Sequence, residues 1–220
     1  NNNDIKLFGF TADIEITGDG SERTVTLKNI QGDLGGLKYV KIADNTAKDK
    51  AGNKAKTWAK VQVYVTGTAE SVADEVLKSI IKNSWSDEKK ARAIHDYMKS
   101  HCHYVGTSNH TDWRSAGLRG IRYQSGDCYT YYAICRLLLT RANIPNIMIK
   151  RYPVYNARHF WNLTYVAGGW YHLDTTPRQR KGRFCLVTDA QLYGYSSGNT
   201  FSFNKSLYPK RATKKISSNP

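Results

Sequence analysis

The sequence predicts an α+β domain, with helices packed on an antiparallel sheet, preceded by an N-terminal all-β domain. Apolar and polar residues alternate in several segments before Gly67, as they do in half-buried strands. After Gly67 the apolar residues follow helical spacing, and strand-like runs return from Asn146 onward. We therefore divide the chain into domains at residues 1–66 and 67–220.

The all-β domain is predicted from alternating segments separated by Gly and Asp clusters. These segments are Ile5–Leu7, Arg23–Leu27, Leu37–Ile42 and Val61–Val65. The stretch 49–53, Asp-Lys-Ala-Gly-Asn, resembles the turn before the last strand of bacterial immunoglobulin-like modules. This resemblance implies an immunoglobulin-like domain, whole or partial. The alternative is that these strands belong to the same domain as the rest.

Two helices are expected after the boundary. Apolar residues between Val72 and Ile81 share one helical face. Ser86 followed by Asp87 and Glu88 is typical of a helix start, because a Ser side chain caps backbone N–H groups and acidic residues suit the positive end of the helix dipole. This second helix is expected to run to about Ser100.

A loop of roughly twenty residues is expected next, and a loop that long in a compact domain is more often functional than idle. It carries the polar and aromatic side chains His110, Trp113, Arg114, Arg119 and Arg122. A third helix is expected from about Asp127 to near Asn143, where Asn can adopt the left-handed cap and Pro145 blocks continuation.

The remaining chain is predicted to form the sheet. Strands are expected at Asn146–Tyr152, His159–Val166 and Trp170–Asp174, the last two joined as a hairpin through residues 167–169. The basic, polar tail from Lys210 onward is expected to be disordered.

Composition limits the classes of partner. Lys and Arg outnumber Asp and Glu by 33 to 18, so the net charge is +15 and favours anionic partners. The basic residues are spread along the chain without a helix-turn-helix, zinc-finger or RNP-like motif, so we expect no specific nucleic-acid binding. A polyanionic envelope, such as a Gram-positive wall, suits this diffuse charge. No apolar run approaches the roughly 18 to 20 residues of a membrane span.

The cysteines do not form a recognisable framework. Cys102, Cys128, Cys135 and Cys185 are too few and too irregularly spaced for a disulfide scaffold. Cys102 lies between two histidines, but there is no second ligand pair at zinc spacing, so we expect a helix end there in place of a metal site, and no cofactor.

Cys128 is the candidate nucleophile. The thiolate is the reactive form of Cys, and a position just after Gly126 and Asp127 puts Cys128 in the first turn of a helix. The backbone N–H groups and the dipole there favour an anion, so we expect a lowered thiol pKa. Gly126 would let a substrate backbone approach closely, and the N–H of Cys128 could bind an oxyanion.

The predicted hairpin supplies the base and its partner. It places Asp174 opposite residues 159–163, close enough to hold one nitrogen of His159. Trp161 points the same way as His159 and could shield the pair from water. His172 shares a face with Asp174 and is a second-choice base, and Asp174 before Thr-Thr-Pro could instead cap a turn.

Taken together, these motifs resemble the transglutaminase-like superfamily over about residues 70 to 210. They are Gly-Asp-Cys-Tyr-Thr-Tyr-Tyr-Ala at 126–133, Ala-Asn-Ile-Pro at 142–145, His-Phe-Trp-Asn at 159–162 and Gly-Trp-Tyr-His-Leu-Asp-Thr-Thr-Pro at 169–177. The resemblance implies a papain-like fold with Cys128 as nucleophile, His159 as general base and Asp174 as orienting carboxylate. Asn143 stands where the family usually has Gly, which affects only a helix cap.

Such a site attacks an amide carbonyl and passes the acyl group to water or to an amine. We expect thiol-dependent acyl transfer on a protein or peptide substrate, hydrolytic (a cysteine peptidase or amidase) more than crosslinking of glutamine to an amine. Gln124 and Trp113 are alternative second oxyanion donors. A peptide groove lined by Tyr129, Trp161 and Tyr131 is a further hypothesis.

The rival from another class is a non-catalytic surface adhesion module, against which the intact Cys, His and Asp argue. An immunoglobulin-like module with a basic surface is typical of exported Gram-positive proteins. We therefore expect an extracellular or cell-wall location, with any signal peptide lying outside this sequence.

Overall fold

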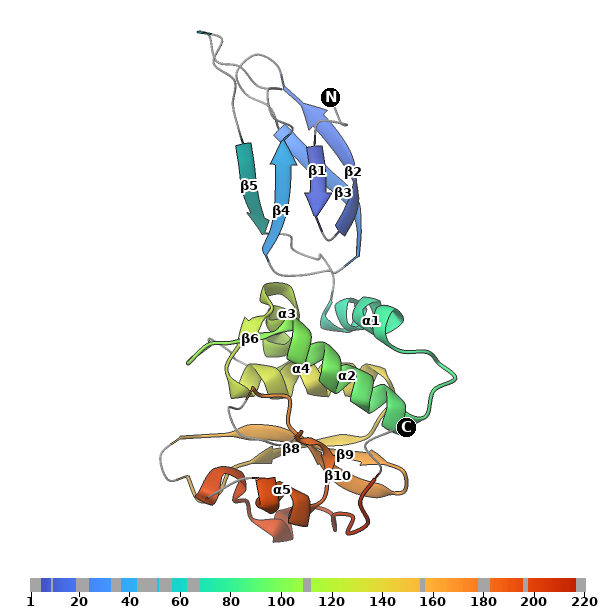
Figure 1. Cartoon of the computed structure of the whole chain (residues 1–220), viewed down its shortest axis with the longest axis vertical. Coiled ribbons are helices and arrows are strands. Elements are labelled where there is room, and N and C mark those ends of the chain that lie inside the picture. The colour runs from blue at the N-terminus through green and yellow to red at the C-terminus, as the bar shows by residue number, and fades with distance from the viewer. Residues whose placement is uncertain are drawn as a thin grey trace. The chain divides into compact units, whose positions relative to one another are not determined.

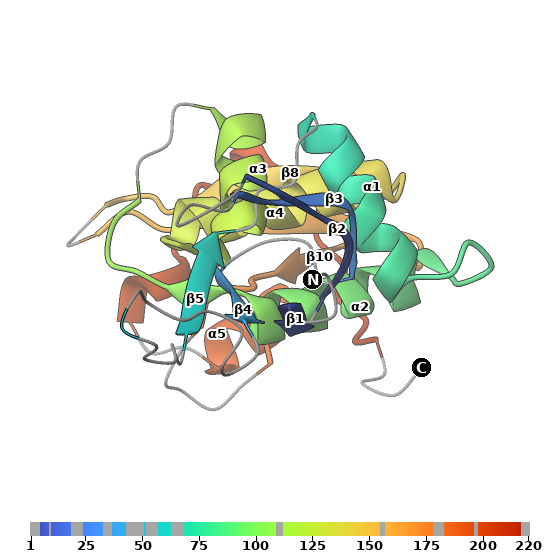
Figure 2. The same cartoon turned by 90° about the horizontal axis from the view of Figure 1, so that it is seen from above.

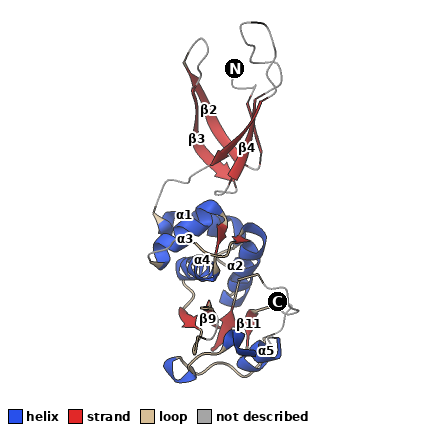
Figure 3. Cartoon of the chain, turned by 90° about the vertical axis from the view of Figure 1, so that its left-hand side faces the viewer, coloured by secondary structure: helices blue, strands red, loops and turns tan. Residues whose placement is uncertain are grey.

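The structure is a computed structural model of the chain. It describes residues 5–8, 10–18, 24–32, 37–42, 51, 57–62, 68–108, 112–154, 157–177, 183–195 and 198–216. The chain divides into two compact units, Asn1–Val65 and Thr66–Pro220. The described elements of the first unit are strands, whereas the helices lie in the second unit (Figure 3).

The first unit contains two antiparallel sheets. Its strands are β1 (Ile5–Phe8), β2 (Phe10–Thr17), β3 (Thr24–Gly32), β4 (Leu37–Ile42) and β5 (Thr57–Gln62). One sheet has the order β1-β4-β5 and the other pairs β2 with β3. The last strand begins at Thr57, ahead of the predicted Val61, and β2 was not predicted. Of the turn motif at 49–53 only Ala51 is described, so an immunoglobulin-like identity stays a prediction.

The second unit packs helices on a four-stranded antiparallel sheet with the order β11-β10-β9-β8. The helices are α1 (Ala69–Ile80), α2 (Asp87–His101), α3 (Trp113–Tyr123), α4 (Cys128–Arg141) and α5 (Asp189–Tyr195). The strands are β6 (His103–Tyr104), β7 (Ser125–Gly126), β8 (Asn146–Lys150), β9 (Phe160–Val166), β10 (Gly169–Leu173) and β11 (Cys185–Val187). Short 3-10 helices lie at Gly198–Phe201 and Lys205–Leu207.

The sheet separates two layers of helices. The helices α1 to α4 lie on one side of it and α5 lies on the other (Figure 1). Seen from above, α3 and α4 lie over β8 (Figure 2), and α4 contacts β8 and β9 directly. The mixed architecture of helices and antiparallel strands confirms the predicted α+β class. None of the described helices combines the length and apolar character that a bilayer crossing requires.

Helix starts follow the capping rules that the sequence indicated. The Ser86 side chain accepts a hydrogen bond from the N–H of Lys89 at 3.3 Å, and α2 begins directly after it. The Asp127 carboxylate accepts from the N–H of Thr130 at 3.0 Å, and α4 begins at the next residue. Asn143 has a left-handed φ of 59°, as predicted for the end of α4.

The predicted long loop is wrong, because most of it forms α3. The Asp112 carboxylate caps this helix by accepting from the N–H groups of Arg114 at 2.8 Å and Ser115 at 3.1 Å. Gly120 faces α4 so closely that an added Cβ would lie 2.5 Å from Cδ1 of Ile134. The glycines lower the helix propensity of the segment, and packing against α4 overrides it. His110 lies outside the described residues.

The prediction of a disordered tail is wrong for residues 210–216. The N–H of Ala212 donates to the carbonyl of Trp170 at 2.9 Å, and the Tyr171 hydroxyl donates to the carbonyl of Lys214 at 3.0 Å. These bonds hold the tail on β10. Polar composition does not reveal such partners, because they come from the tertiary structure.

Candidate active site

Cys128 is the first residue of α4, and the start of this helix is held by hydrogen bonds from neighbouring side chains and backbone. The Asp127 carboxylate caps the helix and also accepts from the N–H of Ser108 at 3.3 Å. The Ser108 and Thr130 hydroxyls are 2.7 Å apart and share a hydrogen bond. The end of the helix that carries the thiol is therefore fixed to the chain that precedes α3.

The thiol lies against the start of β9. Its Sγ is 3.8 Å from the carbonyl oxygen of Arg158, a weak hydrogen bond, and the N–H of Phe160 is close enough to favour the thiolate. Arg158 and Phe160 are the residues on either side of His159. The structure thus brings the Cys128 thiol, at the start of α4, to the backbone on both sides of His159, which directly precedes β9.

His159 is bound to Asp174 as predicted. Its Nε2 lies 2.9 Å from Oδ2 of Asp174, and both side chains are buried. The antiparallel register pairs Leu173 with Asn162, which places Asp174 across from the beginning of β9. In the tautomer that donates from Nε2 to the carboxylate, Nδ1 is the nitrogen that accepts a proton.

Asp174 also caps a turn. Its second oxygen, Oδ1, accepts from the N–H of Thr176 at 3.0 Å. Asp174 therefore both contacts His159 and caps a turn, the two alternatives that the sequence offered for it. With both oxygens bound, the carboxylate has a fixed orientation toward the imidazole.

Aromatic rings enclose the imidazole of His159. The Trp161 ring stacks on it at 5.4 Å and 20°, and Phe201 meets it edge-on at 5.6 Å. Trp161 is 1% exposed, so it shields the pair from water as predicted. The hypothesis of a groove lined by Trp161 and Tyr131 is wrong, because both are fully buried in the core and only Tyr129 is half-buried.

The prediction of a lowered thiol pKa is wrong. Burial raises the pKa of Cys128, and the negative charge of Asp127 raises it further. The N–H groups of Phe160 and Tyr129 act in the opposite direction without reversing the shift. The residue that caps the helix therefore offsets the effect of the helix end, and a neutral thiol at this site needs a base to accept its proton.

The other cysteines are structural. Cys102, Cys135 and Cys185 are buried. Burial raises the pKa of Cys102 and of Cys185 to about 11, and it raises the pKa of Cys135 well above its ordinary value. Among the described residues, no group of three or more His, Cys, Asp or Glu side chains could hold a metal ion.

His172, the predicted second-choice base, makes hydrogen bonds that give it a structural role. Its Nδ1 accepts from the indole N–H of Trp161 at 3.0 Å, and its Nε2 lies 2.7 Å from Oδ1 of Asp189. Both ring nitrogens are therefore engaged away from the thiol. Sequence reasoning gave Asp189 no role of its own, although the stretch 184–189 that ends with it fits the family resemblance and Asp189 lies at a helix start.

The two candidate oxyanion donors occupy different places. Gln124 ends α3 in a left-handed conformation with φ of 51°, and the Trp113 ring contacts the guanidinium groups of Arg114 at 4.9 Å and Arg136 at 4.4 Å. Neither position selects the donor, so this choice stays a prediction. A side chain at Gly126 would clash with Thr130, because an added Cβ would lie 2.2 Å from Cβ of Thr130.

Comparisons with known proteins agree with the fold. The model of the Transglutaminase-like superfamily matches residues 74–175, a range that contains Cys128, His159 and Asp174. The helices and antiparallel sheet of the second unit are consistent with a transglutaminase-like fold. No curated protein matches the chain.

Several solved structures are distantly similar. One is a TGase, with 14% identity and a TM-score of 0.38, covering 50% of this chain and 32% of that protein. Another, from Cytophaga hutchinsonii, is proposed to be a cysteine protease and has 16% identity, a TM-score of 0.38 and coverages of 86% and 69%. A third, from Parabacteroides distasonis, is proposed to be a protease and has 12% identity, a TM-score of 0.33 and coverages of 82% and 39%. The chain thus spans about a third of the length of the TGase.

Proposed function

We propose that the second unit catalyses thiol-dependent acyl transfer on peptide or protein amides, with Cys128, His159 and Asp174 as a catalytic triad. One observation carries the proposal. The Cys128 thiol lies against the backbone on both sides of His159, whose ring is oriented by the buried Asp174 carboxylate. The family-model match over the same residues supports this class of chemistry.

The proposed reaction proceeds in two balanced halves. His159 accepts the thiol proton as Cys128 Sγ forms a bond to the amide carbonyl carbon. Collapse of the tetrahedral intermediate breaks the C–N bond, and the proton on His159 passes to the leaving amine. Water or a second amine then attacks the thioester carbon while His159 accepts its proton, and collapse of this second tetrahedral intermediate breaks the C–S bond as the proton returns to the sulfur. Asp174 stabilises the transient imidazolium.

We propose hydrolysis as the main outcome. The lysine side chain that a crosslinking enzyme uses as acceptor is protonated in solution before it loses a proton and attacks, and the net charge of +15 disfavours the approach of such a cation. Water carries no such penalty. Transfer to an amine is the alternative, and it would use the same three residues.

Alkylation of the cysteines tests the site without knowledge of the substrate. Iodoacetamide labelling is followed at each cysteine by peptide mass mapping between about pH 5 and pH 9. Cys128 should react fastest because the other cysteines are buried, and its rate near neutral pH should fall in His159→Ala. His95→Ala, which removes a buried histidine on α2, controls for general loosening of the fold.

A Cys128 that reacts no faster than the buried cysteines, and whose rate His159→Ala leaves unchanged, would overturn the proposal in favour of a non-catalytic binding module. A positive result leads to a screen of peptides and amines with Cys128→Ala as the blank. Release of new carboxyl groups identifies hydrolysis, and incorporation of a labelled amine identifies transfer.

A further inference from the structure

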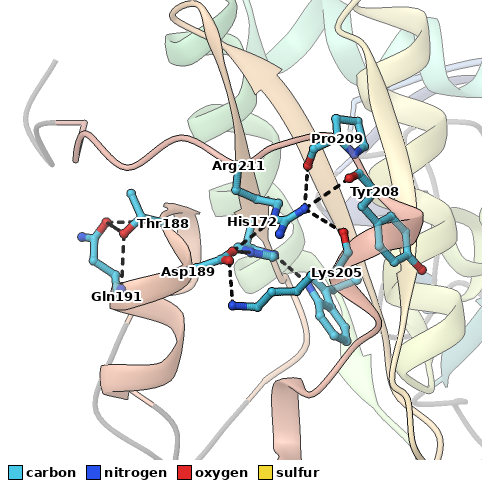
Figure 4. Close-up of polar contacts among 9 residues, drawn as sticks. His172, Thr188, Asp189, Gln191, Lys205, Tyr208, Pro209 and Arg211 are labelled. Carbon is cyan, nitrogen blue, oxygen red and sulfur yellow. Dashed lines mark hydrogen bonds and ion pairs between the residues drawn. The ribbon is translucent and has the colours of Figure 1, made fainter.

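A second histidine and carboxylate, His172 and Asp189, contact each other (Figure 4), and His172 also contacts Trp161. An indole N–H can only donate, so the 3.0 Å contact from Trp161 makes Nδ1 of His172 an acceptor. The ring proton of neutral His172 therefore lies on Nε2 and is donated to Asp189 at 2.7 Å. His172 is 0% exposed and Trp161 is 1% exposed, so the bond between these two side chains is shielded from water.

The Asp189 carboxylate, which ends this series of hydrogen bonds, is held by two cations from the C-terminal segment. Lys205 Nζ lies 3.2 Å from Oδ2 of Asp189, and Arg211 Nε lies 3.4 Å from Oδ1 (Figure 4). The Arg211 guanidinium also donates to the carbonyls of Lys205, Tyr208 and Pro209. Asp189 is therefore held in place by a segment that is itself anchored.

Asp189 remains ionised in this setting. Burial alone would raise the pKa of its carboxyl, but the contacts with His172, Lys205 and Arg211 outweigh burial and hold that pKa below its ordinary range. For His172, burial lowers the pKa, and Asp189 opposes that shift only in part. A neutral His172 matches the pattern of one accepting and one donating ring nitrogen.

At the other end of this series of hydrogen bonds, the ring of Trp161 packs against the imidazole of His159. Trp161 stacks on the imidazole at 5.4 Å, while Phe201 contacts Trp161 edge-on at 5.3 Å. The bond to Asp174 fixes one point of the imidazole, but a face contact is needed to fix the plane of the ring. Rotation about the Cβ–Cγ bond can flip an indole, and the hydrogen bond to His172 selects the orientation in which Nε1 of Trp161 points to Nδ1 of His172.

We propose that His172 and Asp189 are positioning residues of the acyl-transfer site, which orient His159 through Trp161. The inference rests on the proposed function, because orientation of His159 matters only if it acts as a base toward Cys128. It assigns the second histidine–carboxylate pair a role without any contact to the reacting atoms. A displacement of about 1 Å between a base and its nucleophile can cost up to about a hundredfold in rate.

A double-mutant cycle tests whether His172 acts through Trp161. The variants are His172→Phe, Trp161→Phe and the combination of both, and the readout is the rate of Cys128 alkylation across the pH range. His172→Phe leaves the indole N–H without an acceptor and should lower the rate near pH 7 by about tenfold. Trp161→Phe should have a similar effect. The double variant should be no slower than Trp161→Phe alone.

Two further variants separate positioning from stability. His95→Phe removes another buried histidine, which contacts Asp96 on α2, and it should leave the alkylation rate unchanged while lowering the unfolding temperature. Asp189→Asn keeps an acceptor oxygen for His172 and should rescue most of the rate that Asp189→Ala loses. Circular dichroism of the helices confirms that each variant is folded.

The proposal is overturned if His172→Phe alters neither the rate nor the pH profile of Cys128 while His159→Ala alters both, a result that leaves the proposed function intact. Additive losses from His172→Phe and Trp161→Phe would also overturn it, since His172 would then act by another route. If His172→Phe does not fold, Asp189→Ala decides, and an unchanged rate overturns the proposal. Failure of the proposed function is distinguishable, because His159→Ala would then have no effect.

Discussion

Two histidine–carboxylate pairs of the second unit, His159–Asp174 and His172–Asp189, differ in what lies beside the histidine. In both pairs a buried histidine contacts a carboxylate through Nε2, at 2.9 Å for His159 and at 2.7 Å for His172. The backbone beside His159 touches a half-buried thiol, whereas Nδ1 of His172 accepts from the indole of Trp161.

The carboxylates differ as well. Asp174 has a backbone N–H on its second oxygen, and Asp189 has two cations. Because the charge of Asp189 is already neutralised by Lys205 and Arg211, that carboxylate has less to offer an imidazolium. The same two residue types are thus suited to proton transfer in one place and to rigid support in the other.

The largest expected effect separates the two carboxylates. Asp174→Ala should lower the rate of Cys128 alkylation near pH 7 by about a hundredfold or more, because His159 loses the carboxylate that orients its ring and stabilises its protonated form. Asp189→Ala should cost about tenfold, because it acts only through other residues. Parallel labelling of the two variants checks this order, and equal losses would contradict the distinction.

The second prediction concerns stability. His172→Phe should lower the free energy of unfolding by about 2 kcal/mol, since it leaves the buried indole N–H of Trp161 unsatisfied. In the Trp161→Phe background the same change should cost less, because the donor has already been removed. Urea unfolding followed by the helical circular dichroism signal measures both values. A cost that is the same in both backgrounds would show that the hydrogen bond to Trp161 is not the cause.

The third prediction is a loss of stability in acid. Burial lowers the pKa of His172 below its ordinary value, so below about pH 6.5 the unfolded chain binds more protons than the folded chain. The free energy of unfolding should therefore be highest above that pH and decline as the pH falls toward the folded-state pKa. His95, which faces Asp96, Lys99 and Arg183, shifts in the same direction for the same reason.

Urea unfolding at pH 7 and pH 5 tests this sign. His172→Phe should lose less stability than the wild type between these two values, because one of the titrating groups has been removed. Wild-type stability that rises on acidification would mean that the native histidines gain protons, contrary to the burial argument.

The smallest expected effect concerns Lys205, which lies at the exposed edge of the His172–Asp189 pair. Lys205 is half-exposed, so its ion pair with Asp189 is screened by water, and Lys205→Met should change the free energy of unfolding by no more than about 0.5 kcal/mol. Arg211 is largely buried and donates to several carbonyls, so Arg211→Met should cost several times more. Equal, small effects would mean that the C-terminal segment does not hold Asp189.

The contact between His159 and Asp174 could be predicted because it follows from local rules. Period-two alternation and a short turn at Ala167 and Gly168, both with positive φ, define the hairpin, and its register alone brings Asp174 to His159. The start of α4 is set by the Asp127 cap, so the place of Cys128 in the fold was also readable from its neighbours.

Features that depend on distant contacts were not predictable in this way. Helix α3 contains Gly117 and Gly120, which weaken a helical pattern, and it is stabilised by close packing on α4. Asp189 reaches His172 only because β10 and α5 pack together. The raised pKa of Cys128 depends on burial, which a helix-start pattern cannot report.

The burial of His159 has a consequence for the order of events in acyl transfer. His159 is only 3% exposed, with Trp161 and Phe201 packed around its ring, so in the proposed reaction the reacting molecules would approach the base from the side where Cys128 lies. The departing amine and the incoming acceptor must then use one entrance in turn. Ping-pong kinetics would be built into the shape of the protein, and a slowly departing first product would act as a competitive inhibitor of the second half-reaction.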